Sequence, residues 1–270
     1  MTQERKTPGG GATLTILERP LTPRSLIASL LLGMRPPRMP AARLVEWCGL
    51  FGVAEGTARV ALSRMLDRGE LLARDGVYEL AGRLRGRLPA QEWSLAPRVT
   101  TWDGDWLLSV VEPGARTAAE RAALRDAMRR LRLVELRDGV WCRPDNLPRA
   151  AAPADAWEIA DAQCAWWRGR PGADALAEVV ERFGAEAWAG RARALTDRLR
   201  SSTAALDPAD GPTIADAFTV GAAALAHVRA DPLLPAELCG RTWPGGALRD
   251  EYSAYRSAFA DAVRDWFRAR

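Results

Sequence analysis

The feature that most constrains this fold is a helix-length run of residues with a tight hairpin directly after it. Residues 55–68 place apolar side chains at helical spacing. Two short segments, 71–74 and 77–80, then flank the dipeptide Asp75-Gly76. Asp-Gly between two such segments is typical of a type I′ turn, whose two central residues need positive φ. The sequence therefore predicts a helix followed by two antiparallel strands.

Two further helices are expected before this helix and hairpin. Thr22 and Pro23 form an N-cap and N1 pair, which predicts that a helix begins at Pro23. The proline-rich segment 35–40 ends it, and a second helix is expected over about 41–51. Three helices and a hairpin in so short a stretch have the element order of a winged helix-turn-helix.

The helix over 55–68 has one apolar side and one side suited to a DNA groove. At about 100° per residue, its apolar residues gather on one side. The opposite side carries small residues and arginines, which offer donors for phosphates and guanine edges and a methyl group for thymine. The candidate DNA-binding residues are Thr57, Arg59, Val60, Ser63 and Arg64 on this helix, and Arg74 beside the turn. The alternative is a surface helix whose arginines are simply solvated.

The positive charge of the chain is concentrated in its N-terminal third. Residues 1–100 carry 15 basic and 9 acidic side chains, whereas residues 101–172 carry 11 of each and residues 173–270 carry 12 and 14. Arginine accounts for all basic residues except Lys6, so arginine content alone is weak evidence of function. A local basic excess attracts a polyanion, most often the phosphate backbone of a nucleic acid.

The pattern changes after residue 100. Strands are expected over 106–112, 133–136, 140–142 and 163–167, with a helix over 118–131 between the first two. This order predicts a small ferredoxin-like α+β domain. Four helices are expected beyond it, over about 173–183, 185–200, 213–228 and 247–268.

The expected fold class is therefore multidomain α+β. A winged-helix domain is expected over 13–87, a ferredoxin-like middle domain over 88–172 and a helical C-terminal domain over 173–270. The segment 83–87, RLRGR, is interpreted as a basic linker that either contacts a DNA backbone or is solvated.

Several functional classes are disfavoured by the residues and motifs of the chain. The four cysteines lie far apart and the only histidine is His227, so neither a metal site nor a disulfide framework is expected. No nucleophile elbow, P-loop or dinucleotide motif is found, so we expect no enzyme activity and no cofactor. No apolar run reaches the ~20 residues of a membrane span, and no signal-peptide pattern is found, so a cytoplasmic chain is expected.

Four motifs, in chain order, resemble those of the PaaX-type transcriptional repressors, whose type member controls phenylacetic acid degradation. ARVALSRMLDRGEL (58–71) looks like the recognition-helix signature, with Val60 where threonine is expected. WDGDW (102–106), ERAALRDAMRRL (120–131) and DGVWCRPDNL (138–147) look like middle-domain signatures. HVRADPLLPAEL (227–238) with WPG (243–245) looks like the C-terminal one, although residues 239–241 interrupt a Leu-Pro segment.

The resemblance implies a dimeric repressor that binds double-stranded operator DNA and is released by an acyl-CoA thioester, phenylacetyl-CoA in the type case. It also implies a middle domain similar to the small ferredoxin-like protein of CRISPR integration complexes. The alternative from another class is a DNA-associated architectural or interaction module without small-molecule control. A specificity ratio of ~10³ or more for one operator over random DNA separates the two.

An effector is expected to bind within residues 88–270, in a cleft between the tryptophan-rich middle domain and the C-terminal helices. Flat indole rings suit an aromatic acyl group, and arginines suit the phosphates of coenzyme A. The candidate effector-binding residues are Trp102, Trp106, Trp141, Arg129, Arg132, His227 and Arg229. The alternatives are core positions for the tryptophans and a solvated helix end for the arginines.

Overall fold

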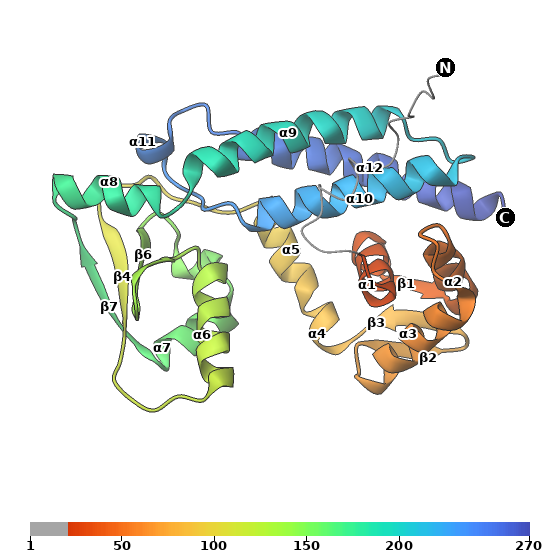
Figure 1. Cartoon of the computed structure of the whole chain (residues 1–270), viewed down its shortest axis with the longest axis horizontal. Helices are drawn as coiled ribbons and strands as arrows, with labels where there is room; N and C mark the ends of the chain where they lie inside the picture. Colours follow the sequence, from red (N-terminus) through yellow and green to blue (C-terminus); the bar gives the residue numbers. More distant parts are fainter. Residues whose placement is uncertain (1–20) are drawn as a thin grey trace, which may run out of the picture. The chain divides into compact units, whose positions relative to one another are not determined.

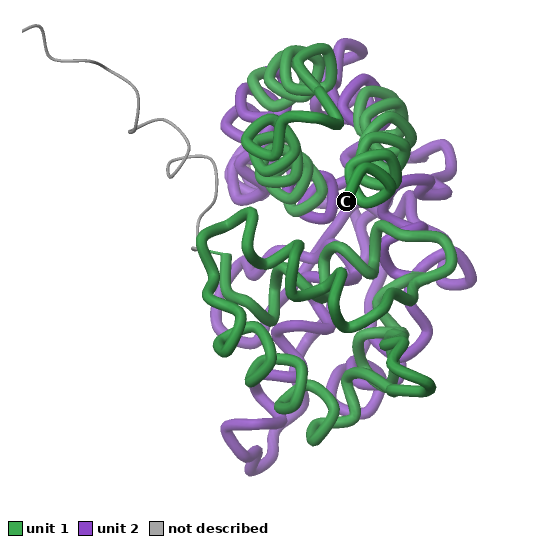
Figure 2. The backbone as a smooth tube through the Cα atoms, turned by 90° about the vertical axis from the view of Figure 1, so that its right-hand side faces the viewer, with its two compact units in different colours: residues 1–89, 194–226, 250–270 green, residues 90–193, 227–249 purple. Residues whose placement is uncertain are grey.

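The computed structural model describes residues 21–270, the side chains of residues 173 and 174 excepted (Figure 1). These residues form two compact units (Figure 2). Unit 1 comprises the chain up to Pro89 together with Ala194–Ala226 and Asp250–Arg270, and unit 2 comprises Ala90–Arg193 and His227–Arg249. The expected winged-helix domain starts at residue 13, which lies outside the described residues, and the three domain boundaries stay a prediction.

Unit 1 begins with the expected three helices and hairpin, α1 (Pro23–Gly33), α2 (Ala41–Gly49), α3 (Glu55–Asp67), β2 (Leu71–Arg74) and β3 (Val77–Leu80). Thr22 caps α1 because its side chain accepts a hydrogen bond from the Ser25 amide. Asp75 and Gly76 both have positive φ, 51° and 74°, which confirms the type I′ geometry that the sequence predicts.

Unit 1 also contains elements that the sequence analysis did not predict. The strand β1 (Arg38–Pro40) pairs with β3 and makes a three-stranded sheet in the order β1-β3-β2. Pro36 and Pro37 before this strand and Pro40 within it argued against a strand, and proline is tolerated there because β1 lies at the sheet edge. The interpretation of 83–87 as a linker is wrong, because α4 (Gly82–Arg85) and α5 (Arg87–Leu95) follow the hairpin directly.

The core of unit 1 is built from both ends of the chain. Parts of α9 (Ala185–Ala204), α10 (Gly211–Arg229) and α12 (Gly245–Arg268) belong to this unit. Trp47 on α2 is fully buried and meets Phe218 and Trp266 edge to face, at centroid distances of 5.1 and 6.4 Å. Residues of the helix-turn-helix and of the later helices therefore form one hydrophobic core. Aromatic pairs of this geometry stabilise it beyond the burial of apolar surface alone.

Unit 2 contains the expected ferredoxin-like domain. Its strands and helices alternate as β4 (Trp106–Val111), α6 (Ala118–Arg130), β5 (Val134–Arg137), β6 (Val140–Pro144), α7 (Ala154–Asp161) and β7 (Cys164–Gly169). The sheet order is β5-β6-β4-β7, and every neighbouring pair is antiparallel. This order is that of a ferredoxin-like sheet, although the sequence analysis did not foresee α7 or the short 3-10 helix η1 (Arg149–Ala151) before it.

The two faces of this sheet are covered differently (Figure 1). On one face, Trp141 and Cys164 pack with buried residues of α6 and α7. On the other face, Trp106 and Cys142 pack with Val179 of α8 (Ala173–Glu181) and with Leu238 of α11 (Ala236–Cys239). Among the described residues, no helix is both long and apolar enough to cross a membrane.

Candidate nucleic-acid interface

Helix α3 divides into the two sides that its sequence predicts. Ala58, Leu62 and Met65 are 0, 3 and 1 % exposed, and they anchor the helix in the core of unit 1. The outward side is exposed along its length, and Val60 retains half of its surface. All five candidate DNA-binding residues on α3 are exposed, namely Thr57, Arg59, Val60, Ser63 and Arg64. Their contacts with DNA stay a prediction.

The two arginines on this outward side differ in their partners. Arg59 pairs with Glu55 one turn earlier, with a nitrogen–oxygen distance of 2.7 Å, and both side chains are more than half exposed. Such a pair stabilises a helix by less than ~1 kcal/mol, so Arg59 exchanges its partner for a phosphate at little cost. The side chain of Arg64 is exposed and makes no hydrogen bond or ion pair with any described residue, so its guanidinium is available to a ligand.

A hollow of about 270 Å³ lies beside α3 at the start of α1. Thr57, Val60 and Arg64 line it together with Arg24 and Arg68, two residues that the sequence analysis did not single out. Arg68 follows Arg64 by one helical turn, and this spacing was the signal that could have identified it. Arginines around a recess of this size are suited to a phosphate group of a DNA backbone.

The hairpin of β2 and β3 carries Arg74 at its tip, beside the turn. Arg74 is exposed, and the neighbouring strand β1 adds a second exposed arginine, Arg38. The ladder aligns Arg38 with Glu79 and Arg74 with Val77, so the two arginines lie on one face of the sheet. Both line a hollow of about 660 Å³. Sequence reasoning missed Arg38 because it missed β1.

The candidate effector-binding tryptophans do not gather at one place. Trp102 and Trp106 meet edge to face at 6.0 Å on the α8 side of the sheet, where Trp106 is only 2 % exposed. Trp141 lies on the opposite face of the same sheet, against α6 and α7. The three residues therefore belong to two separate hydrophobic clusters of unit 2, on opposite faces of the sheet.

The other effector candidates have structural contacts within unit 2. Arg132 is 9 % exposed, donates a hydrogen bond to the carbonyl oxygen of Arg229 and lies over the Trp93 ring at 4.9 Å. Burial lowers the pKa of Arg132 to about 10. His227 stacks on Trp188 at 4.5 Å, and its Nε2 lies 2.9 Å from the Trp188 carbonyl oxygen. Arg129 is exposed on α6.

A buried arginine that sequence reasoning missed lies close to these residues. Arg143 is 1 % exposed and donates to the carbonyl oxygens of Leu131 and Pro144, at 2.8 and 2.9 Å. Its third contact is the side-chain oxygen of Asn146, at 2.6 Å. Burial lowers the pKa of Arg143 to about 9, because the interior disfavours a charge. The only signal for it was its place in the motif DGVWCRPDNL.

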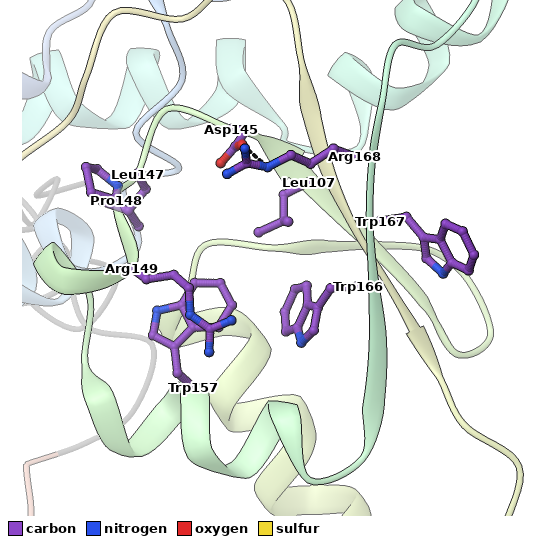
Figure 3. Close-up of a pocket in the computed structure, with 9 residues that line it drawn as sticks. All are labelled: Leu107, Asp145, Leu147, Pro148, Arg149, Trp157, Trp166, Trp167 and Arg168. Carbon is purple, nitrogen blue, oxygen red and sulfur yellow. Dashed lines mark ion pairs between the residues drawn. The ribbon is translucent and has the colours of Figure 1, made fainter.

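A hollow of about 340 Å³ opens on the α7 side of the sheet (Figure 3). The rings of Trp157 and Trp166 form part of its wall, 4.9 Å apart, and Arg149 lies 4.1 Å above the Trp157 ring. Arg168 closes another side, paired with Asp145 at 2.7 Å. Trp167 points away from the other side chains of the hollow (Figure 3). Indole faces and arginines together suit a flat, anionic ligand.

The comparisons with known proteins agree with this architecture. The family described as PaaX-like protein matches residues 22–84, and the family described as PaaX protein central Cas2-like domain matches residues 99–187. The chain is also similar to the solved structure of an uncharacterized protein, Rv0674, from Mycobacterium tuberculosis, with 34 % identity and a TM-score of 0.65 over 90 % of this chain and 97 % of that one. No curated protein matches the sequence.

Proposed function

Because the chain belongs to the PaaX family of DNA-binding transcription regulators, we propose that it is a repressor that binds one operator sequence and leaves it when a small acyl-CoA-type effector binds. The proposal that the chain binds an operator rests on the outward side of α3. Ser63 and Arg64 are exposed on a helix whose other side is buried in the core of unit 1. Both side chains are therefore accessible to DNA, and neither contributes to the packing of the core. A helix of small residues and arginines fits the width of a major groove.

The position of each side chain indicates whether it contacts bases or phosphates. We expect Ser63, Arg64 and the methyl groups of Val60 to contact base edges, which specify sequence. We expect Arg68 beside the hollow at α1, and Arg74 with Arg38 on the hairpin sheet, to contact phosphates, which set position and supply affinity. This arrangement predicts strong salt dependence together with strong sequence preference.

The effector half of the proposal rests on the hollow of Figure 3. Its two indole rings offer a wall for an aromatic acyl group, and Arg149 and Arg168 stand where a charged group would lie. Both arginines are paired with aspartates, Arg149 with the exposed Asp161 and Arg168 with the partly buried Asp145, so an anionic ligand would replace these partners. Release from DNA requires that the ligand bind the free and the DNA-bound conformations unequally, since equal affinity shifts no equilibrium.

The DNA half is tested by enriching duplexes from a random library with the full-length protein. We expect one related set of sequences, bound ~10³-fold or more above random duplex. Ser63→Ala and Arg64→Ala should each weaken the enriched duplex by about 1–3 kcal/mol and leave the thermal unfolding midpoint unchanged. Arg125→Ala, an exposed arginine on α6, is the matched control. Equal affinity for enriched and random duplex would favour an architectural protein.

The effector half is tested separately by calorimetry on the same full-length protein. The panel contains acyl-CoA thioesters with aromatic and aliphatic acyl groups, the free aromatic acids and coenzyme A alone. We expect one thioester to bind and the same compound to release the protein from its enriched duplex. Binding should weaken in Arg149→Ala and in Arg168→Ala, whose side chains are 57 and 71 % exposed, whereas DNA affinity without ligand should stay unchanged. If no compound of the panel binds, the effector proposal is wrong and the DNA-binding proposal is unaffected.

A further inference from the structure

The short helix α4 follows the hairpin of unit 1 and is held against the end of α3 (Figure 1). The amide of Ala81 donates a hydrogen bond to the carbonyl oxygen of Glu70, directly before β2, at 2.9 Å. A Cβ on Gly82 would come within 2.6 Å of the carbonyl oxygen of Gly69, and the φ of Gly82, 48°, is one that other residues rarely adopt. Leu84 is 2 % exposed and anchors α4 in the core of unit 1. The position of α4 relative to α3 is therefore fixed.

The segment that contains α4 is strongly basic. Residues 82–88 include three arginines and no acidic residue, and all three arginines are exposed. Arg83 and Arg85 belong to α4, and Arg87 begins α5. Gly86 between the two helices has helical dihedral angles, φ −62° and ψ −13°. Arg87 therefore follows Arg83 by one helical turn on the same side, whereas Arg85 lies on another side.

Arg83 lies near a carboxylate that is already paired with another arginine. Glu70 accepts hydrogen bonds from Arg24 through both of its oxygens, at 2.7 and 2.6 Å. These hydrogen bonds lower the pKa of Glu70, and the positive charges of Arg68 and Arg83 lower it further. Three guanidinium groups therefore lie near one carboxylate, which leaves an excess of positive charge. Arg68 follows Arg64 by one turn on the exposed side of α3, so this excess continues the outward side of that helix.

Arg83 and Arg87 lack the acidic partner that Arg85 has. Arg85 pairs with Glu79 at a nitrogen–oxygen distance of 3.4 Å, whereas neither Arg83 nor Arg87 forms an ion pair with any described residue. Two like charges one turn apart on a helix destabilise it. An anion bound by both side chains would remove this repulsion. The pair is therefore better suited to binding a polyanion than to a merely solvated surface.

We propose that Arg83 and Arg87 bind phosphates of the DNA backbone beside the bases that α3 contacts, so that the DNA-binding surface extends past the hairpin to α4 and the start of α5. This inference rests on the proposed binding of DNA through α3. Guanidinium groups form charge-assisted hydrogen bonds with phosphate oxygens, and such contacts fix the register of a protein on a duplex without reading its sequence. Because α4 is fixed against the end of α3, phosphates bound by Arg83 and Arg87 position α3 in the groove.

The first test measures the salt dependence of DNA binding by the full-length protein. Arg83→Ala and Arg87→Ala should each flatten the slope of log affinity against log salt by about 0.9, and the double variant should flatten it by about 1.8. Both should weaken enriched and random duplexes by the same factor. Arg85→Ala is the matched control, because it removes the same charge from another side of the same helix, and it should leave the slope unchanged. The thermal unfolding midpoint should be unchanged in all three variants, since the side chains are exposed.

The outcomes of this test separate the α4 contact from the proposed function. If the wild type binds the enriched duplex and both Arg83→Ala and Arg87→Ala keep its slope, the α4 contact is wrong and DNA binding through α3 is unaffected. Equal flattening in Arg83→Ala and Arg85→Ala would also overturn the contact, because it would indicate only a general effect of net charge. If the wild type binds no duplex, the proposed function is wrong, and the α4 contact fails with it.

The second test locates the contact on the DNA. Single phosphates of the enriched duplex are replaced, one in each duplex, by methylphosphonate groups, which carry no charge. Replacement of a phosphate that Arg83 binds should weaken binding of the wild type and have no further effect on Arg83→Ala, because that contact is already lost. The phosphates coupled to Arg83 and Arg87 should differ from those coupled to Arg74 on the hairpin. If no single phosphate is coupled to Arg83 or to Arg87, the proposal is overturned.

Discussion

Arg143 donates a hydrogen bond to the side-chain oxygen of Asn146 at 2.6 Å, and Asn146 in turn donates to the carbonyl oxygen of Leu233 at 3.0 Å. Asn146 is 2 % exposed, so the whole relay is shielded from water. The relay joins two motifs that lie about ninety residues apart, DGVWCRPDNL and HVRADPLLPAEL. Asp231 also fixes the segment around Leu233. It is fully buried, accepts a hydrogen bond from the Leu233 amide at 2.9 Å and forms an ion pair with Arg249 at 2.7 Å.

The first prediction is that Arg143→Met destabilises the protein by about 3 kcal/mol or more. The substitution keeps most of the side-chain volume but leaves three buried acceptors without a donor, and each costs about 1–3 kcal/mol. Urea unfolding monitored by tryptophan fluorescence checks this. Arg125→Met on the exposed face of α6 is the control and should stay within ±0.5 kcal/mol. Equal stability of Arg143→Met and wild type would show that the relay contributes no net stability.

The second prediction compares two glycines in helices. In Gly221→Ala on α10, the added methyl group would lie 2.2 Å from the hydroxyl oxygen of Tyr255, a buried residue of α12, so the substitution should cost about 1–3 kcal/mol. In Gly190→Ala on α9, the methyl group meets nothing within 4 Å, and the gain in helix propensity should stabilise the protein by up to about 1 kcal/mol. Thermal unfolding of the two variants should therefore shift in opposite directions. A stabilised Gly221→Ala would mean that Tyr255 can move aside.

Local signals were sufficient for much of this fold. The hairpin of β2 and β3 was predicted to the residue because Asp75-Gly76 accepts positive φ at both turn positions. The first helix was predicted from its cap and N1 proline. The strand β1 was missed because its pairing with β3 is not encoded near it in sequence. Neighbouring prolines also argue against a strand unless it lies at an edge.

The candidate sites were predictable to different degrees. Burial along α3 follows helical periodicity, so the exposed side of that helix could be derived from sequence. The tryptophans of unit 2 required the strand order of the sheet. Trp106 pairs with Pro144, and Trp141 lies an odd number of residues from Pro144, so the two indoles fall on opposite faces. Arg143 has a buried role that polar side chains rarely take, and no local pattern distinguishes it from a solvated arginine.

The third prediction concerns pH and the pair of Arg24 and Glu70. Arg24 donates to both carboxylate oxygens of Glu70, at 2.7 and 2.6 Å, and this contact lowers the pKa of Glu70. A carboxyl group whose pKa is lower in the folded state adds stability above its unfolded pKa of ~4.3 and loses it as pH falls through the folded pKa. Because Arg24 is partly exposed, the contribution should stay below ~1 kcal/mol.

A double-mutant cycle with Arg24→Gln and Glu70→Gln measures this contribution directly. The coupling energy should be favourable at pH 7 and should decline as the pH falls below ~4.3 and through the lowered folded pKa of Glu70, because only the ionised carboxylate is stabilised by the guanidinium. Urea unfolding of the four proteins at each pH supplies the measurement. A coupling energy that grows on acidification would contradict the assigned direction of the shift.

The fourth prediction separates phosphate contacts on the hairpin sheet from base contacts on α3. Arg38 and Arg74 lie on one face of that sheet and line one hollow, so we expect both to neutralise backbone phosphates. Each lost phosphate contact removes about 0.9 from the slope of log affinity against log salt. Arg74→Ala and Arg38→Ala should therefore flatten this slope by nearly one each, and by nearly two together. Both should weaken enriched and random duplexes by the same factor, since a phosphate carries no sequence information.

Arg64→Ala should behave differently, with a larger loss on the enriched duplex than on random DNA, because a lost base contact affects only the sequence that it recognises. Fluorescence anisotropy titrations at four salt concentrations measure both quantities. A loss in Arg74→Ala that is confined to one base pair of the enriched duplex would instead make this residue a base contact.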